Sequence, residues 1–565
     1  MGLDGFFGWC TNEKNFLFGK EVSLIKRNSL PVIQHLLIDF NSFIYSERKK
    51  LKKLPMEQIN ILKSLPFEER ENVLIRNIIE KLFKLIEKID PLISVGIFSE
   101  GTIPLARLNG VRRENYSKLF YEQRDREIPQ DEEDLAKEAE PTIFEGKLYM
   151  GSDSQFMKKL FDKLLEEYNS YSFGELKVYL YGPNYAGEGE QKLFSHLRTH
   201  IRKGETVLID GNDADLILLS FIYPEHYIFI HRTNELGNFE TFIDISQLSF
   251  CYYRGICRLL HFIHPVIQQR ILYDFVLLCL FAGNDYIYHL PGITMRRGLN
   301  KLIDTYVDIL RYKLEQKCID PYFITRKNVT EINQDFLCKF LLSLDKNEQN
   351  NLIQFSKNET FFNSIKYNWS ILKKEKYKKL LLSENDKYNY FSFNYSDVNW
   401  RNNYREKILN LSIHTDTSAE IDKICKEYFE SILFCVRAYF DDEINWHWHD
   451  ELYVSPLTID LFDYASRINI NTLTLPKGEP IHPVLSKIIT NPRSKLDHLT
   501  EKISDLLRKP EFDRYYIEVD FMDKRNIFAW GKTKVTDIKL KVPFPEEIKN
   551  FFFDFFNQYR HLIYK

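Results

Sequence analysis

Two aspartates, Asp213 and Asp215, stand two residues apart shortly after a short apolar run at 206–209. A Gly-Asn turn follows the run, and a second apolar run that can continue as a helix begins after the aspartates. Strand, turn and helix form the unit of a parallel α/β sheet, in which ligands gather beyond the carboxyl ends of the strands. The two carboxylates therefore indicate a ligand site, unless one of them only caps the following helix.

The same arrangement recurs along the chain, and this repetition favours a ligand site. Further acids follow the apolar runs at 32–38, 92–98, 176–181 and 275–282: Asp39, Glu100, Glu188, Glu190 and Asp285. If 206–209 and the first three of these runs are parallel strands of one sheet, their trailing carboxylates converge at one edge.

Seven carboxylates in one crevice would repel each other by several kcal/mol unless divalent cations neutralise them. Carboxylate oxygens are the ligands that Mg²⁺ prefers, and two such ions flanking a phosphodiester stabilise its attacking and leaving oxygens. The acidic residues therefore predict a metal site for phosphoryl-transfer chemistry.

The segments between the acids provide the elements that would position them. Apolar residues at helical spacing over 54–90 predict a pair of crossover helices, and 227–230 and 242–245 are strand-like. A basic segment at 107–113 directly follows the Glu100 strand end, where its cations would lie near a substrate phosphate. The alternative for this segment is a solvated helix face.

Composition limits the class of protein. The chain has 565 residues, enough for several domains, and a net charge of −3, which argues against a non-specific nucleic-acid coat. Its eight cysteines form no CxxC pair, so we expect reduced cysteines and a location in the cytosol or the nucleus. No apolar run reaches about 18 residues, so no transmembrane span is expected. The abundance of Asn, Lys, Ile, Phe and Tyr hints at a virus or an AT-rich genome.

Several sequence blocks resemble the 5′→3′ exoribonuclease (XRN) family, a branch of the metal-dependent 5′-nucleases. The blocks are MGLDGFF at 1–7, DFNSFI at 39–44, GEGEQK at 187–192, DADLI at 213–217 and GNDYIYHLP at 283–291. The likeness continues more loosely through WRNNY at 400–404 and WHW at 446–448. It implies an α/β fold with a parallel or mixed central sheet flanked by helices, as in a PIN-like nuclease core, and a second, mostly helical region. We expect a catalytic region at 1–309, a polar linker or helical connector at 310–395, and the second conserved region at 396–565, packed on the catalytic core.

The resemblance also implies roles for particular residues. The metal site carries over as Asp39, Glu100, Glu188, Glu190, Asp213, Asp215 and Asp285. Glu100 stands where the family has aspartate, so its carboxylate is displaced by one methylene. Two aromatic rings that clamp the first bases correspond to Tyr45 and Trp446, although each could instead be a core residue.

The pocket for a 5′-monophosphate is the largest departure from the family. The family's lysine corresponds to Arg107, and Arg112 and Arg113 supply further cations. Its glutamine and paired arginines, however, fall on Val111, Glu114 and Asn115. Charge is retained in this segment, but its geometry differs from the family pattern.

The resemblance predicts a monomeric, processive 5′→3′ exoribonuclease that degrades 5′-monophosphorylated single-stranded RNA to nucleoside monophosphates in RNA and mRNA decay. Two Mg²⁺ ions would serve as cofactors, with Mn²⁺ as a substitute. One alternative is a flap or structure-specific 5′ DNA nuclease, but LPGITMRRG at 290–298 lacks the closely spaced second glycine of a duplex-gripping hairpin. Another is a catalytically weak RNA-binding scaffold, which would require losses among the seven acids.

Overall fold

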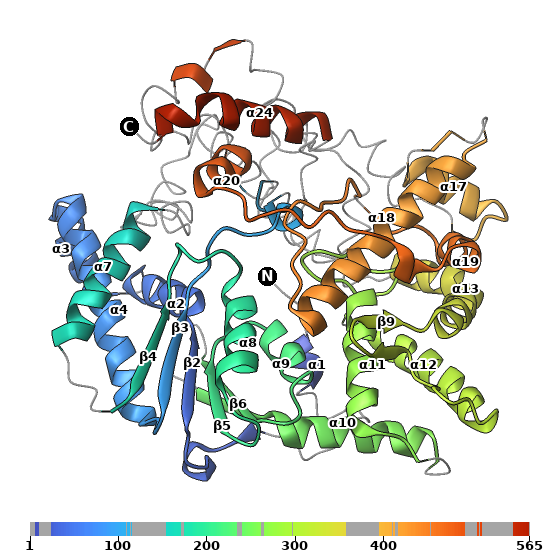
Figure 1. The fold of residues 1–565 in the computed structure, drawn as a ribbon, viewed down its shortest axis with the longest axis horizontal. Helices are drawn as coiled ribbons and strands as arrows, with labels where there is room; N and C mark the ends of the chain where they lie inside the picture. Colours follow the sequence, from blue (N-terminus) through green and yellow to red (C-terminus); the bar gives the residue numbers. More distant parts are fainter. Residues whose placement is uncertain are drawn as a thin grey trace. The chain divides into compact units, whose positions relative to one another are not determined.

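The chain folds into two compact units, shown in Figure 1. The structure, a computed structural model, describes residues 6–10, 24–52, 54–108, 110–112, 115, 154–170, 175–233, 240–261, 265–295, 298–356, 395–409, 411–412, 416–452, 454–491, 505–507, 509–510 and 546–563. Unit 1 comprises Met1–Gly2, Phe7–Ile103 and Pro129–Arg258, and unit 2 comprises Leu3–Phe6, Pro104–Ile128 and Leu259–Lys565.

Unit 1 is built on a seven-stranded mixed sheet. Its strands are β1 (Leu24–Ile25), β2 (His35–Asp39), β3 (Ser94–Phe98), β4 (Lys177–Tyr181), β5 (Thr206–Asp210), β6 (Tyr227–Thr233) and β7 (Glu240–Asp244). The order across the sheet is β1-β7-β6-β5-β2-β3-β4. Strands β6, β5, β2, β3 and β4 are parallel, and β7 is antiparallel to its neighbours β6 and β1. The predicted α/β class with a mixed, mostly parallel sheet is therefore confirmed.

Helices cover this sheet because the strands are apolar on both faces. Alternate residues Leu36 and Ile38 of β2 share one buried cluster with helices α2 (Phe40–Lys52), α4 (Phe67–Ile89) and α7 (Gln155–Ser170). Helix α8 (Gly189–His200) packs on β2 and β3, and Figure 1 shows it on the other side of these strands from α4 and α7. The predicted crossover pair is confirmed as α3 (Met56–Ser64) and α4. Unit 1 also holds α9 (Asp215–Ser220) and most of α10 (Ile245–Leu259).

Unit 2 is mostly helical where the structure describes it. Its elements are α11 (Gln268–Phe281), α12 (Leu299–Glu315), the hairpin β8 (Ile324–Arg326) and β9 (Thr330–Ile332), α13 (Gln334–Ser356), α17 (Trp400–Lys407), α18 (Ser418–Val436), α19 (Thr458–Arg467), α20 (Pro483–Thr490) and α24 (Glu546–Ile563). The apolar run at 275–282 forms the second half of α11. The three-part division with a connector at 310–395 stays a prediction, and 357–394 lie outside the described residues.

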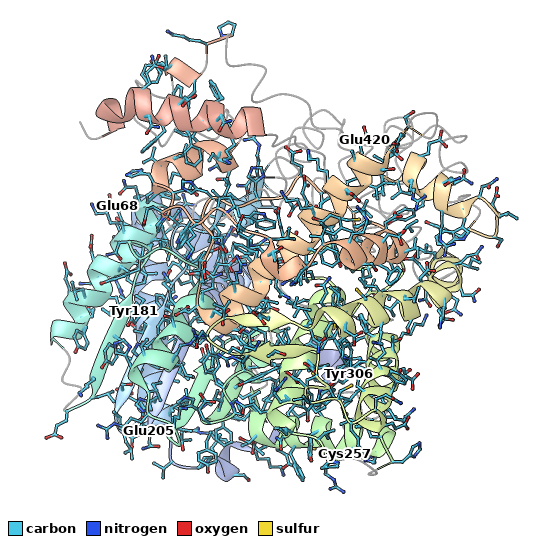
Figure 2. All side chains as sticks on the ribbon, turned by 45° about the vertical axis from the view of Figure 1, so that its right-hand side comes forward. Glu68, Tyr181, Glu205, Cys257, Tyr306 and Glu420 are labelled. Atoms are coloured by element: carbon cyan, nitrogen blue, oxygen red, sulfur yellow. The ribbon has the colours of Figure 1, made fainter. Side chains whose placement is uncertain are left out.

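A buried carboxylate joins three elements of unit 2. Asp274 of α11 is fully buried and accepts hydrogen bonds from the backbone N–H groups of Phe323 (3.0 Å) and Ile324 (2.7 Å). It also accepts one from the hydroxyl of Tyr306 on α12 (2.7 Å), a residue labelled in Figure 2. Burial raises the pKa of Asp274 to about 7, although all three donors favour the ionised form. Among the described residues, no helix combines the length and the apolar composition needed to cross a membrane.

A second buried acid, Glu348, lies where α13 packs against α19 in unit 2. Its side chain is 2% exposed and accepts a hydrogen bond from the backbone N–H of Thr458 (2.9 Å). Burial raises the pKa of Glu348 to about 8, against the opposing bond from Thr458 and with added repulsion from Asp345 and Asp460. Glu348 is therefore mostly protonated in the folded chain at neutral pH.

We expect Glu348→Gln to stabilise unit 2 at pH 8 and to change its stability little near pH 4. The unfolded chain releases this proton above about pH 4.5, whereas the folded chain keeps it until about pH 8, so wild-type stability falls as the pH rises through this window. A neutral glutamine removes that loss, by about 1 kcal/mol or more at pH 8. Thermal unfolding at several pH values measures the difference.

The matched control is Glu420→Gln, which removes the same charge from an exposed position on α18 (Figure 2). If the difference in melting temperature between Glu348→Gln and wild type is the same from pH 4 to pH 8, the pKa of Glu348 is not raised.

Candidate active site

The carboxyl ends of four neighbouring parallel strands of unit 1 lie side by side. The register pairs Asp39 at the end of β2 with Phe98 at the end of β3, and Phe98 with Tyr181 at the end of β4. On the other side of β2, Ile38 pairs with Asp210 at the end of β5. Six predicted site acids lie at or just beyond these ends: Asp39, Glu100, Glu188, Glu190, Asp213 and Asp215. We name this set the carboxylate edge.

Asp39 is a buried member of the carboxylate edge with a hydrogen bond to its carboxylate. Its side chain is 7% exposed and accepts a hydrogen bond from Ser42 Oγ (2.5 Å). Burial raises the pKa of Asp39 to about 6, the Ser42 hydroxyl opposes the rise, and repulsion from Asp213 and Asp210 adds to it. A carboxylate with a raised pKa beside further carboxylates is stabilised by any nearby cation.

Glu190 shows the same mutual repulsion from the side of α8. Burial raises the pKa of Glu190 well above its usual range, and the charges of Glu188, Asp213 and Asp39 raise it further. Glu188 precedes the first residue of α8, and its backbone N–H donates to the side chain of Gln191 (3.2 Å). Four acids from three chain segments therefore act on one another electrostatically.

Glu100 is held by Asn41, a residue to which the sequence analysis gave no role. Asn41 Nδ2 donates to Glu100 Oε2 (2.9 Å), and Asn41 Oδ1 accepts from Ser99 Oγ (3.0 Å) and from the backbone N–H of Glu100 (3.2 Å). One carboxamide thus fixes both the backbone and the carboxylate at the end of β3. In the sequence, Asn41 is visible only as an asparagine in the first turn of the helix that follows Asp39. Nothing in the sequence connects this asparagine to Glu100.

Asp213 makes a hydrogen bond at the start of α9, whose N-cap residue is Ala214. Asp213 Oδ1 accepts from the backbone N–H of Asp215, the first residue of α9 (3.1 Å). An ionised carboxylate has two oxygens with about four lone-pair positions, so this bond does not exclude a metal-ligand role. Arg232 Nη1 donates to the backbone carbonyl of Asp213 (3.2 Å), which anchors the turn from the neighbouring strand β6.

A short loop carries Glu188 back to the end of β3. The backbone N–H of Gly101 donates to Gly187 O (2.9 Å), and that of Gly187 donates to Thr102 O (2.8 Å). A Cβ at Gly101 would lie 1.8 Å from the carbonyl oxygen of Tyr185, so only glycine permits this approach. Lys192 Nζ donates to the same carbonyl of Tyr185 (2.9 Å). Burial lowers the pKa of Lys192 to about 8, against the opposing charges of Glu100 and Glu190.

The chemistry of the carboxylate edge suits divalent cations. Among the described residues, no group of three or more His, Cys, Asp or Glu side chains is already arranged as a ligand shell. Burial is the main cause of the raised pKa values of Asp39 and Glu190, and repulsion from neighbouring acids adds to it. Hard cations with oxygen ligands offset such repulsion, and the donor set therefore fits Mg²⁺ or Mn²⁺.

The seventh predicted acid, Asp285, belongs to unit 2, so the complete seven-acid cluster stays a prediction. Asp285 follows α11 in a loop shaped by Asn284, whose Oδ1 accepts from the backbone N–H groups of Tyr286 (2.9 Å) and Ile287 (2.8 Å). Arg107 Nη2 lies 2.8 Å from Asp285 Oδ2. Within unit 2, one predicted phosphate-binding cation is therefore paired with one predicted metal ligand.

The other predicted phosphate-binding residues also fall in unit 2. Arg112 is 1% exposed, donates through Nη1 to the carbonyl of Ile489 in α20, and lies 5.5 Å from the ring of Phe552 in α24. Asn115 donates to the carbonyl of Thr490 (3.1 Å), and Val111 is partly exposed. Arg113 and Glu114 lie outside the described residues. The structure thus engages Arg112 with α20 and α24, and its role in phosphate binding stays a prediction.

The two predicted base-stacking rings lie in different units. Tyr45 of α2 is partly exposed and packs against the core of unit 1. Trp446 in unit 2 is also partly exposed, and its backbone carbonyl accepts from the N–H of Leu105 (3.0 Å). The nearby Trp448 is 3% exposed and stacks on Phe434 with 5.1 Å between ring centroids. Trp446, rather than Trp448, keeps the exposure that base stacking requires, and the clamp itself stays a prediction.

The mixed sheet with acids at adjacent strand ends defines an α/β protein with an acidic site at the edge of its sheet, and comparisons with known proteins specify the family. Residues 1–234 match the model of the XRN 5′-3′ exonuclease N-terminus, and residues 266–379 match that of the Xrn1 helical domain. The chain belongs to the XRN family.

Individual relatives are distant in sequence. The chain is 26% identical to 5′-3′ exoribonuclease 1 of Schizosaccharomyces pombe over 326 residues, which cover 53% of this chain and 23% of that protein. It is 26% identical to a putative 5′-3′ exonuclease of Acanthamoeba polyphaga mimivirus over 155 residues, or 25% of this chain and 24% of that one. With 5′-3′ exoribonuclease 2 of Kluyveromyces lactis the identity is 23%, over 55% of this chain and 36% of the relative. The chain thus spans about a quarter to a third of the length of these relatives.

Proposed function

We propose that this chain is a Mg²⁺-dependent 5′→3′ exoribonuclease that degrades single-stranded RNA to nucleoside monophosphates. The observation that carries the proposal is the carboxylate edge, where acids gather at the ends of adjacent parallel strands. Burial first, and repulsion from neighbouring acids second, raise the pKa of Asp39 and of Glu190 there. Relatives named 5′-3′ exoribonucleases support the direction of attack and the type of substrate. Action in mRNA decay, in the cytoplasm or the nucleus and as a monomer, belongs to the same proposal.

In this mechanism the carboxylates of Asp39, Glu188, Glu190 and Asp213 would hold the cations, with Glu100 and Asp215 as further ligands from unit 1. Two bound cations would stabilise the attacking and leaving oxygens of the scissile phosphodiester. Asn41 keeps the Glu100 carboxylate aimed at the edge. Lys192 and Gly101 hold the loop that presents Glu188.

Substrate positioning falls to residues outside the carboxylate edge. Arg107, with Arg113, would receive a 5′-terminal monophosphate through charge-assisted hydrogen bonds, whereas Arg112 is buried against α20. Tyr45 in unit 1 and Trp446 in unit 2 would each stack on a base, for about 1–3 kcal/mol per base, without reading its sequence. Stacking holds the strand between rounds of hydrolysis and so favours processive degradation.

Digestion of matched RNA and DNA single strands with a 5′-monophosphate tests the function directly. We expect RNA to be shortened from its 5′ end to mononucleotides with Mg²⁺ or Mn²⁺, and EDTA to stop the reaction. Products resolved by length separate this activity from internal cleavage of a flapped duplex. An RNA that is bound but left intact at every metal concentration would instead identify a binding scaffold.

We expect Asn41→Ala to lower the rate of RNA hydrolysis about 10- to 100-fold and to raise the Mg²⁺ concentration needed for half-maximal rate. The substitution leaves Glu100 without the carboxamide that orients it, while RNA affinity should change little. Rate against Mg²⁺ concentration measures both effects. Asn60→Ala, at an exposed position of α3, is the control. An unchanged Mg²⁺ requirement in Asn41→Ala would assign Asn41 to folding alone.

A further inference from the structure

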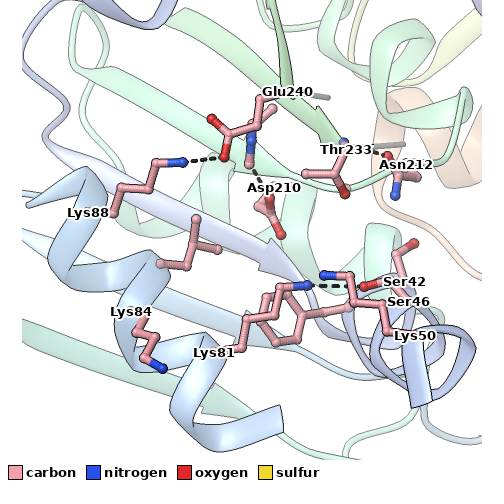
Figure 3. Close-up of a pocket in the computed structure, with 14 residues that line it drawn as sticks. Ser42, Ser46, Lys50, Lys81, Lys84, Lys88, Asp210, Asn212, Thr233 and Glu240 are labelled. Atoms are coloured by element: carbon pink, nitrogen blue, oxygen red, sulfur yellow. Dashed lines mark hydrogen bonds and ion pairs between the residues drawn. The ribbon is translucent and has the colours of Figure 1, made fainter. Parts of the chain in front are cut away.

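A small basic pocket opens beside the carboxylate edge, within unit 1 (Figure 3). Its lining includes four lysines, one from α2 and three from α4: Lys50, Lys81, Lys84 and Lys88. Gly211 and Asn212, in the turn that follows β5, also line it. We name it the lysine pocket. None of these lysines belonged to the basic segment that the sequence analysis singled out.

Four lysines and two carboxylates line the lysine pocket, and Glu47 and Glu80, outside the lining, pair with three of the lysines. The two carboxylates of the lining are Glu240, which pairs with Lys88, and Asp210, which pairs with His231 at 2.6 Å. Glu47 pairs with Lys81 and lies 3.0 Å from Lys50.

Lys84 has the weakest ionic partner of the four lysines. It is 75% exposed, and its ammonium lies 3.9 Å from Glu80, itself 56% exposed, a distance and exposure at which an ion pair contributes little. Burial lowers the pKa of Lys81, Glu47 opposes the change, and the ammonium of Lys50 adds to it. An anion bound in the pocket would offset both the desolvation of the Lys81 ammonium and its repulsion from Lys50.

The cavity has a volume of about 160 Å³. That volume accommodates a phosphate group, whereas pockets that enclose a whole drug-sized ligand hold about 300–1,000 Å³. A nucleotide would therefore place its phosphate inside and its base outside.

The lysine pocket adjoins the carboxylate edge through two shared residues. Ser42 lines the pocket and donates to Asp39 (2.5 Å). Gly211 also lines it, and a Cβ added at Gly211 would lie 3.1 Å from Asp39 Cβ. A phosphate in the pocket would thus be a near neighbour of a phosphate bound at the carboxylate edge.

We propose that the lysine pocket binds a nucleotide phosphate, either one of the RNA backbone next to the scissile bond or that of a released nucleoside monophosphate. The proposal rests on the proposed function and adds a second phosphate site, in unit 1, to the arginines of unit 2. In the lysine pocket, Lys81 and Lys84 supply positive charge, and the turn at Gly211–Asn212 lies between the pocket and Asp39.

Binding without hydrolysis tests the site. The full chain in EDTA is titrated with a short single-stranded RNA and, separately, with AMP, over a range of salt concentrations. The variant carries Lys81→Met and Lys84→Met, which remove two charges and keep the length of the side chains. We expect RNA affinity to fall at least about fivefold and the slope of log affinity against log salt to become shallower by about 1.4, or about 0.7 for each lost phosphate contact.

The matched control carries Lys163→Met and Lys203→Met, two exposed lysines of unit 1 whose loss gives the same change in net charge. Lys203 precedes β5, at the end of that strand opposite to Asp210. Lys84→Met alone serves as a second variant because Lys84 is the most exposed of the four lysines, and it should change the salt slope by about half as much.

Each result decides the question. Weaker binding of RNA alone supports a backbone phosphate, and weaker binding of AMP as well supports the released monophosphate. Unchanged binding of both, or an equal loss in the control, overturns the site. RNA hydrolysis with Mg²⁺ is measured separately. If the wild-type chain hydrolyses RNA but the pocket variant binds RNA and AMP as well as wild type does, only the inference about the lysine pocket is refuted. Binding that depends on the pocket in a chain that never hydrolyses RNA would refute the proposed activity alone.

Discussion

Replacing Asp213 and Asp215 together by asparagine should lower RNA hydrolysis by at least about a hundredfold and leave RNA binding largely intact. Each substitution keeps the shape of the side chain and removes one anionic ligand, and charge stabilisation in the transition state is worth several kcal/mol. The asparagine introduced at position 213 retains an oxygen that can accept the hydrogen bond from the N–H of residue 215. Single-turnover rates with excess enzyme measure the effect on the chemical step.

Stability provides an independent readout of the same substitutions. The charge of Asp213 helps to raise the pKa of both Asp39 and Glu190, so its removal relieves repulsion. The double variant should therefore melt no lower than wild type in EDTA and should gain less from added Mg²⁺. Asp90→Asn with Asp162→Asn, at two exposed positions of unit 1, is the matched control. A double variant that hydrolyses RNA within tenfold of the wild-type rate would remove the two-metal hypothesis.

The chemical group at the 5′ end of the RNA should have the second large effect. We expect monophosphate ends to be degraded fastest, hydroxyl ends next, and triphosphate and capped ends slowest. A small pocket of arginines accepts one phosphate and excludes larger groups by size, whereas a hydroxyl leaves the guanidinium donors unpaired, at about 1–3 kcal/mol or more. Discrimination between these 5′ ends should be weaker than the family pattern implies, because Val111, Glu114 and Asn115 stand where the family has polar or basic residues.

Arg107→Ala tests whether this selection depends on the segment after Glu100. We expect the ratio of kcat/KM for monophosphate and hydroxyl ends to fall about tenfold. Arg467→Ala is the matched control, because Arg467 also pairs with an aspartate of unit 2, Asp422 (2.6 Å). Triphosphate RNA degraded as fast as monophosphate RNA would refute the closed pocket. An unchanged ratio in Arg107→Ala would place the pocket on other residues.

Sequence patterns were sufficient for the local elements of unit 1. The apolar runs that end near Asp39, Glu100, Glu188 and Asp213 correspond to β2, β3, β4 and β5, because β-branched and aliphatic residues in runs of this length form buried strands. Their parallel pairing followed from the crossover helices between them. The grouping of the acids at one edge is a direct consequence of that pairing.

Features that depend on contacts between distant residues were not accessible in this way. The run at 275–282 ends in Asp285 like the others but is helical, since buried helices and buried strands are both continuously apolar. Nothing local marks Asn41 as the partner of Glu100, or Arg112 as a buried residue that contacts Ile489. The lysine pocket could not be predicted from the sequence, because its lysines come from two helices and lysines along a helix usually indicate a solvated face.

The order of the strands in the sheet has a consequence for how the protein is made. β2 pairs with β5, so the segments that carry Asp39 and Asp213 are joined only after about 170 intervening residues have been synthesised. At about 5–20 residues per second, the ribosome needs roughly 10–35 s for that stretch. During this interval the backbone N–H and C=O groups of β2 have no partner on the β5 side, and nonlocal parallel pairing is intrinsically slow. A nascent chain therefore cannot assemble the carboxylate edge before β5 has emerged and has paired with β2.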